Sequence, residues 1–451
     1  MFQLETRNRC AALLVAAMIF GQLLALGAVG GSPSAFFALC EIALCLGLIF
    51  MLDQPSSEGL WRAVAPVMLL FLCALTWAAA PDWLTGLVTG RPFRALAPDA
   101  RPVELLKLAG LGAIWLSGGL IGLSRARLQQ FVLCLAVLGL AYTLLALRIG
   151  QASPLAVWGQ PKGAHAFRFT GTFLNANAAG CVFGMLGVVA LGLLQSLMKR
   201  VDLRQAPLME QVRLGLAACA VVAAFGACVL TQSRTALTLA GLFGAIMVVI
   251  EAWRGLRRER ASKARLAVLG LTAVLLTASL GLGASQISSR WGTFVADANL
   301  RAESYAHYFA AIAASPWFGY GLGGFRMAHA SLLNPALAGA TWDFGAAHSA
   351  VTQAALEGGL PFLALLLAAV GVALAQALMV RRSRGAMVSG LIAAAALAFC
   401  FSFVDIALNT PAIAALCCLL IGVAWGDAVG WRAGARGATG AAQAGTGSSD
   451  V

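Results

Sequence analysis

One stretch organises the chain: Thr341-Trp-Asp-Phe-Gly-Ala-Ala-His-Ser-Ala-Val-Thr-Gln-Ala-Ala-Leu-Glu-Gly-Gly-Leu-Pro361. It joins the longest segment without a membrane-spanning pattern to the last group of apolar spans. His348, Gln353 and Glu357 stand in it where the apolar sequence begins. Ionisable groups at such a boundary are costly to place, which makes them candidates for a functional site.

The composition is typical of a polytopic α-helical membrane protein. Of the 451 residues, 60% are hydrophobic and only 11% are charged, and the mean hydropathy is +0.85. Soluble globular chains do not reach these values. The net charge of +13 is concentrated in short connectors between apolar runs, which indicates membrane topology and not nucleic-acid binding. The 11 cysteines lie in or beside apolar runs, so we expect neither disulfides nor a zinc site.

Windows of roughly 20 apolar residues predict an all-α protein with about 12 transmembrane helices. The predicted spans cover approximately residues 11–30, 34–52, 63–80, 103–123, 129–147, 176–197, 214–230, 235–252, 266–284, 360–380, 386–405 and 410–428. Basic residues recur in every second connector, so the positive-inside rule places those connectors and both termini in the cytoplasm. The Gly- and Ala-rich residues 431–451 predict a disordered cytoplasmic tail.

The connectors on the opposite side include three long ones, at about 81–102, 148–175 and 285–347. The last lies between predicted spans nine and ten and is too long for a simple link, which predicts a folded, functional segment. The tryptophans of these connectors fit either anchors at the lipid headgroups or a surface that stacks on sugars.

His348 is expected at the start of a helix, ahead of a Gly358-Gly359-Leu-Pro361 break before the next span. The other three histidines, His165, His307 and His329, are expected to pack in loops or to face solvent. The partial positive charge of a helix N-terminus disfavours imidazolium, and a neutral imidazole is suited to act as a general base. The alternative is a histidine that links a loop to the headgroups. On a helical wheel Gln353 and Glu357 share a face, whereas Glu357 points away from His348, so the sequence does not predict a His–Glu pair.

Two arginines on the same side are candidates for binding an anion. Arg234 lies in a very short turn before a span, where a guanidinium adds its charge to the helix N-terminus. The alternative is an arginine that reaches for phospholipid headgroups. Arg168 makes the connector before span six a second cationic surface, and Asn175 and Asn177 after it both fit a helix cap. Arg301 in the long segment is a further candidate, with ordinary surface charge as its alternative.

The sequence lacks Asp-x-Asp, His-Glu-x-x-His, P-loop and Gly-x-Ser-x-Gly motifs. Carboxylates on the side of His348 are scattered rather than paired at the spacing of metal ligands. We therefore expect no metal or other cofactor, and we expect any bound phosphate to be neutralised by arginines.

Four motifs occur in order: Thr170-Gly-Thr-Phe-Leu-Asn-Ala-Asn177, Thr231-Gln-Ser-Arg-Thr235, Ser315-Pro-Trp-Phe-Gly-Tyr-Gly-Leu-Gly323 and His348-Ser-x-x-x-Gln353-x-x-x-Glu357-Gly-Gly. Together they resemble the O-antigen ligase family, a membrane superfamily that also holds polysaccharide polymerases and bacterial O-oligosaccharyltransferases. The resemblance covers roughly residues 165–360, and the first five spans match only in general character. Ser349 departs from the family, in which Asn often follows the histidine, and this leaves the substrate class open.

The resemblance implies a metal-independent, inverting enzyme of the bacterial inner membrane whose active face is periplasmic. It would move a glycan from undecaprenyl diphosphate to an acceptor hydroxyl, which for a ligase belongs to lipid A-core. His348 matches the family's catalytic histidine, and Arg168 and Arg234 best match its diphosphate-binding arginines. Further candidates for substrate binding are Arg301, Gln353, Glu357 and Asn177.

We divide the chain into membrane helices at 1–165, a ligase- or polymerase-like core at 166–430 and the tail at 431–451. A polymerase and a protein O-oligosaccharyltransferase remain alternatives within the superfamily. A flippase for lipid-linked glycans is disfavoured, because the predicted spans carry few of the charges that a polar path would need.

Overall fold

The computed structural model describes residues 2–52, 57–90, 94–199, 205–256, 270, 291–333, 338–339, 341–342, 344–379 and 385–446. Within these residues the chain is an all-α membrane bundle, as predicted, and ten of its helices are long and apolar enough to cross a membrane. They are α1 (Phe2–Leu24), α2 (Gly31–Met51), α3 (Ser57–Ala78), α5 (Arg101–Gly122), α6 (Arg125–Ala152), α7 (Ala176–Met198), α8 (Leu208–Leu230), α9 (Arg234–Leu256), α14 (Ala350–Leu378) and α16 (Pro411–Thr446).

The shorter apolar helix α15 (Ala386–Phe401) occupies the eleventh predicted span. Apart from residue 270, the ninth predicted span, 266–284, lies outside the described residues. A two-residue hairpin, β1 (Ala156–Val157) with β2 (Gln160–Pro161), and the 3-10 turns η1 (Leu26–Ala28), η2 (Gly163–His165) and η4 (Ala407–Asn409) lie in the connectors.

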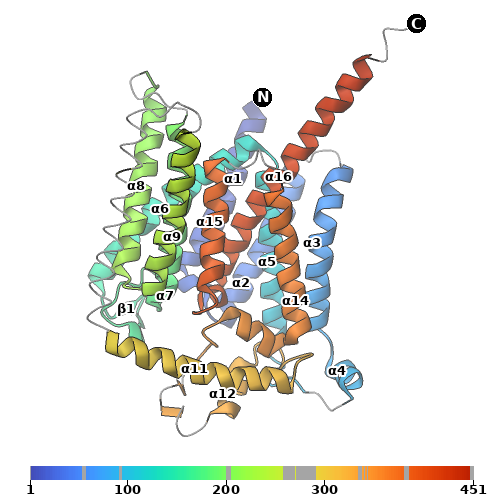
Figure 1. Cartoon of the computed structure of the whole chain (residues 1–451), viewed down its shortest axis with the longest axis vertical. Helices are drawn as coiled ribbons and strands as arrows, with labels where there is room; N and C mark the ends of the chain where they lie inside the picture. The colour runs from blue at the N-terminus through green and yellow to red at the C-terminus, as the bar shows by residue number, and fades with distance from the viewer. Residues whose placement is uncertain are drawn as a thin grey trace.

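The spans stand side by side, and both termini lie at the same end of the bundle (Figure 1). Two helices of the long connector lie at the opposite end, which we call the α11 end: α11 (Trp291–Ala314), which runs across it, and α12 (Phe325–Leu332). The short helix α4 (Asp82–Thr89) lies at the same end. We call the other end the terminal end. The long connector is therefore folded, as its length predicts.

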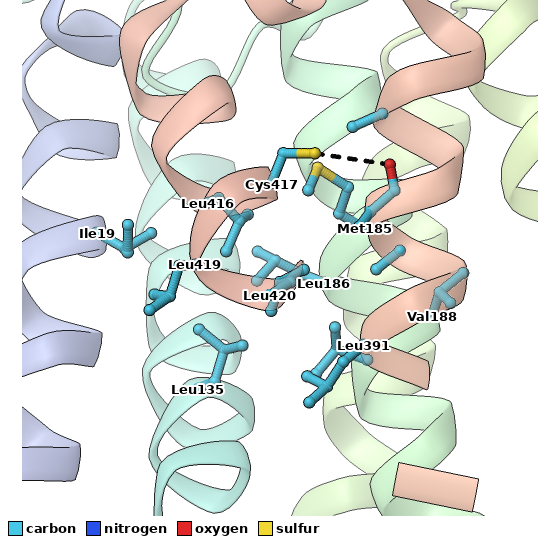
Figure 2. Packing of buried hydrophobic residues seen from close by; sticks show 14 of the residues in the cluster. Ile19, Leu135, Met185, Leu186, Val188, Leu391, Leu416, Cys417, Leu419 and Leu420 are labelled. Carbon is cyan, nitrogen blue, oxygen red and sulfur yellow. Dashed lines mark hydrogen bonds between the residues drawn. The ribbon is translucent and has the colours of Figure 1, made fainter. Parts of the chain in front are cut away.

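The centre of the bundle is formed by α7 and α16, whose most apolar windows are 89% and 94% buried. In Figure 2, Leu416, Leu419 and Leu420 of α16 lie beside Met185 and Leu186 of α7. These aliphatic side chains are buried against one another, and such close contact gains dispersion energy.

Helices α5 and α16 approach each other closely along a glycine seam, which consists of Gly118, Gly119 and Gly122 on α5 with Gly422, Gly426 and Gly430 on α16. A Cβ atom added at any of these positions would lie closer than 3.0 Å to atoms of the other helix or of Leu123, which follows α5. In lipid, helices gain little from burying apolar surface against each other, so small residues that allow close packing hold them together.

Helix α14 contains the predicted break. Gly359 has φ +80° and ψ 173°, and Pro361 follows without an N–H. The carbonyls of Leu356 and Glu357 therefore lose their helical partners. They accept instead from Tyr320 N at 2.8 Å and Gly321 N at 2.9 Å, so the turn before α12 docks onto the break.

Helix α16 continues beyond the last predicted span as far as Thr446. Alanine recurs throughout residues 431–446, and alanine has the highest helix propensity of any residue. Disorder of the cytoplasmic tail at 431–451 stays a prediction.

Candidate functional site

His348 lies directly before α14 and not within it. Ser349 is the N-cap residue, and its hydroxyl accepts from Thr352 N at 3.3 Å. His348 itself has φ +52°, a left-handed conformation that is uncommon for a residue with a side chain. The hydroxyl of Tyr305 on α11 donates to the His348 carbonyl at 2.8 Å. The long connector thus helps to hold the histidine in this conformation.

The imidazole of His348 faces a carboxylate that the sequence analysis missed. His348 Nδ1 lies 4.0 Å from Asp405 Oδ1, and the Asp405 side chain is only 3% exposed. This distance is too long for a hydrogen bond but suits an ion pair once the ring is protonated. The ring of Phe344 packs edge-on against the imidazole, with 4.7 Å between the centroids.

Asp405 was assigned to the end of the eleventh predicted span, and this assignment concealed it. In the structure α15 ends at Phe401, and Asp405 lies in the connector before η4. The available signal was a lone carboxylate between two apolar spans, on the side predicted for His348.

Asp405 connects His348 to two residues that the sequence singled out. Its Oδ2 accepts from Asn177 Nδ2 at 2.8 Å, and Asn177 Oδ1 accepts from Arg168 Nη2 at 3.3 Å. Of the two asparagines that fit a cap of α7, Asn175 takes that role, because its side chain accepts from the N–H groups of Asn177 and Ala178. We call the chain Arg168–Asn177–Asp405–His348 the polar network.

Arg168 also joins the polar network to the turn that carries Arg234. Its guanidinium donates to the Thr231 carbonyl from Nε at 3.3 Å and from Nη2 at 2.9 Å. Thr231 begins the short turn before α9, and Arg234 is the first residue of that helix and is half-buried. The two predicted anion-binding arginines therefore come from connectors that are held together by a two-donor contact.

The histidine beside Arg168 is electrically neutral. The pKa of His165 is lowered to about 4, mainly by burial and next by the charge of Arg168, against a smaller opposing effect of Asp405. His165 Nδ1 lies 3.2 Å from Arg168 Nη1. A neutral ring accepts a hydrogen bond from the guanidinium there, so His165 adds no positive charge to this surface.

Gln353 and Glu357 form a second chain of contacts, in line with their predicted common face. Gln353 Nε2 donates to Glu357 Oε1 at 3.0 Å, and Gln353 Oε1 accepts from Ala347 N at 3.2 Å and from Asn409 Nδ2. Glu357 accepts from the N–H groups of Gly323 and Phe325 at the start of α12. These contacts tie the loop before His348 to the long connector. Substrate binding by either residue stays a prediction.

His329 supports the floor of the site, which fits its predicted role in loop packing. Tyr308 Oη and the Thr341 carbonyl lie 3.0 Å and 2.7 Å from its two ring nitrogens. Its ring stacks between those of Phe325 and Phe344. Burial raises the pKa of Tyr308 to about 12, so its hydroxyl keeps its proton at neutral pH.

Arg301 lies on α11, but its side chain is outside the described residues. In the described part of the chain, no three His, Cys, Asp or Glu side chains gather closely enough to hold a metal ion. The described contacts therefore bring together a histidine, a buried carboxylate and Arg168, and Arg168 contacts the turn that precedes Arg234.

A comparison with protein families places part of this arrangement in a known group. The family model described as O-Antigen ligase matches residues 219–367. The matched segment runs from α8 to α14 and contains Arg234, α11, α12 and His348. No curated protein matches the chain. Arg168, Asn177 and Asp405 lie outside the match and are joined to it by the contacts described above. Residues 219–367 are thus similar to the O-antigen ligase family, and the match covers about a third of the chain.

Proposed function

We propose that this protein is a glycosyltransferase that moves a glycan from undecaprenyl diphosphate to an acceptor hydroxyl on the periplasmic side of the bacterial inner membrane. In the form we favour it is an O-antigen ligase, and the acceptor is lipid A-core. The family match supports glycan transfer in a membrane. The observation that carries the mechanism is His348, which faces the buried carboxylate Asp405 in a network that reaches Arg168.

In this proposal His348 is the general base. Asp405 faces Nδ1, which favours the tautomer with the proton on Nδ1 and leaves the lone pair of Nε2 to take a proton. The acceptor hydroxyl gives that proton to Nε2 as its oxygen attacks the anomeric carbon. The carboxylate of Asp405 then stabilises the imidazolium that forms.

The arginines act on the leaving group. The new bond joins the acceptor oxygen to the anomeric carbon while the bond from that carbon to the diphosphate oxygen breaks. Attack from the face opposite the leaving group inverts the anomeric configuration. The diphosphate departs with the bonding electrons, and Arg168 and Arg234 stabilise the growing charge. A single well-placed donor in such a site contributes about 10²–10³-fold in rate.

Deleting the gene and analysing the lipid carrier tests the function. Loss of a ligase leaves full-length polymer on the carrier, together with an acceptor that lacks polymer. Single repeats on the acceptor would contradict ligase activity and indicate a polymerase. Repeat units trapped on the cytoplasmic leaflet would contradict both and indicate a flippase.

A further inference from the structure

A cavity is lined by residues of α1, α6, α7 and α8. The turns that line it lie at the terminal end of the bundle (Figure 1), away from the α11 end, where Tyr305 contacts His348. The cavity has a volume of about 1150 Å³. Pockets for drug-sized ligands usually measure roughly 300–1,000 Å³. The cavity therefore has room for a larger molecule, and the proposed glycosyl transfer does not use it.

The wall of this cavity changes from polar to apolar along the bundle. Glu5 and Arg9 line it near the start of α1, and Leu13 lines it one turn further in. On α6, Leu133 lines it about one turn beyond Gln130. A cavity with a polar rim and an apolar wall on membrane-spanning helices fits an amphiphile with its headgroup at the rim.

The rim carries charges of both signs in equal number. Helix α1 contributes Arg9 paired with Glu5, and α8 contributes Arg213 paired with Glu210 at 2.6 Å. Both pairs lie within one helix and are partly exposed, so each is held weakly and can exchange partners. Such a rim complements a headgroup that carries both a negative and a positive charge better than one with a net charge.

Gln130 presents the cavity with an acceptor that lacks a hydrogen-bond donor. Its Oε1 atom is buried without a hydrogen-bond partner, and the residue lines the cavity. A buried acceptor without a donor costs free energy, which a ligand with an N–H group would recover. A primary ammonium supplies such N–H groups, whereas a quaternary ammonium does not.

We propose that this cavity binds a phospholipid whose headgroup joins a phosphate to a primary ammonium, as in phosphatidylethanolamine. The phosphate lies between Arg9 and Arg213, and the ammonium donates to Gln130 and the rim carboxylates. The acyl chains follow Leu13 and Leu133. The site is independent of the proposed glycosyl transfer, so either proposal can fail without the other.

The full-length protein is reconstituted into nanodiscs of phosphatidylcholine alone, with added phosphatidylethanolamine, or with added phosphatidylglycerol. A ligand that binds only the folded state raises its stability by mass action. We expect phosphatidylethanolamine to raise the melting temperature by about 2–4 °C above the other two compositions. Native mass spectrometry should show the same lipid retained. Equal melting temperatures, or an equal effect of phosphatidylglycerol, would overturn the proposal, the latter by indicating a simple anion site.

Variants then assign the effect to the cavity. Gln130→Leu removes the acceptor at similar size, and Arg213→Gln removes one phosphate partner. Both should abolish the preference for phosphatidylethanolamine. Arg62→Gln is the matched control, because Arg62 lies at the same end on α3 and does not line the cavity, so it should keep the preference. If Gln130→Leu does not fold, lipid retention by Arg213→Gln decides. Retention equal to that of the unmodified protein overturns the proposal.

Discussion

The glycine seam and the polar network hold the molecule together by opposite means. In the seam, α5 and α16 touch because side chains are missing, and backbone meets backbone along several turns. In the polar network, partly buried side chains connect segments that lie far apart in the sequence, such as Arg168 with Thr231 and Asn177 with Asp405. The seam sets how closely two helices pack. The network holds the side chains that we propose for glycan transfer, and their positions depend on that packing.

The backbone φ angles of the two regions also differ. Phe167, Gln232 and His348 have left-handed φ angles, and each lies in or beside a connector that meets the polar network. Such conformations cost of order 1–3 kcal/mol and persist where surrounding contacts enforce them. Among the described residues of α5 and α16, no residue with a side chain has a positive φ. These are three of the six non-glycine residues with a positive φ in the described part of the chain; Leu26 and Ala28 lie in η1, and Trp158 lies in the β-hairpin.

The largest effect is expected from breaking the seam. In Gly426→Leu the new side chain would overlap the Gly119 carbonyl, so we expect no monodisperse, folded protein in detergent extracts. Gly371→Leu on α14 is the control, because a Cβ at Gly371 meets no atom within 4 Å. If size-exclusion profiles of the two variants were alike, close packing along the seam would not be required for folding.

The next effect concerns the arginine of the polar network. Arg168→Lys keeps the charge but loses the two-donor contact with the Thr231 carbonyl. We expect the initial rate of glycan transfer to fall by about 10²–10³-fold. Arg101→Lys, which alters an ion pair with Asp82 at the same end, should retain normal rates. Normal transfer by Arg168→Lys would show that a point charge suffices at this position.

A smaller effect is expected for the missed carboxylate. Asp405→Asn keeps an oxygen for Asn177 Nδ2 but removes the negative charge near the imidazole. We expect the rate to fall by up to about 10²-fold. The acidic limb of the pH–rate profile should move to lower pH, because the imidazolium loses its nearby carboxylate while Arg168 remains. An unchanged profile with a reduced rate would instead indicate a purely structural role.

The smallest effect is expected from relieving backbone strain at Phe167, measured as a change in melting temperature. Phe167 has φ +64° and is 81% exposed, so Phe167→Gly removes few contacts and relieves a conformation that costs roughly 1–2 kcal/mol. The greater freedom of glycine in the unfolded chain offsets part of this gain. We expect an equal or slightly higher melting temperature. Phe36→Gly on α2, where the exposed phenylalanine is helical, should lower it. A lower melting temperature for Phe167→Gly would mean that its side chain stabilises the fold.

Hydropathy predicted the spans because each is a local run of apolar residues, and every predicted span within the described residues has its helix. Local chemistry also predicted the break at Gly359, the cap at Asn175 and the shared face of Gln353 and Glu357. The partner of His348 could not be predicted in this way. Asp405 follows His348 by more than fifty residues in the sequence. It lies near His348 only because α15 ends at Phe401, before the end of the predicted span, and the chain then turns back toward α16.

The account depends most directly on His348. The measurement is transfer of glycan from its lipid carrier to the acceptor by purified His348→Ala, with melting temperature and extraction behaviour compared with the unmodified protein. We predict a loss of at least about 10²–10⁴-fold with normal folding, because the base is removed and a side chain that is 23% exposed is truncated. His307→Ala on α11 is the control and should transfer normally. Normal transfer by folded His348→Ala would contradict the account.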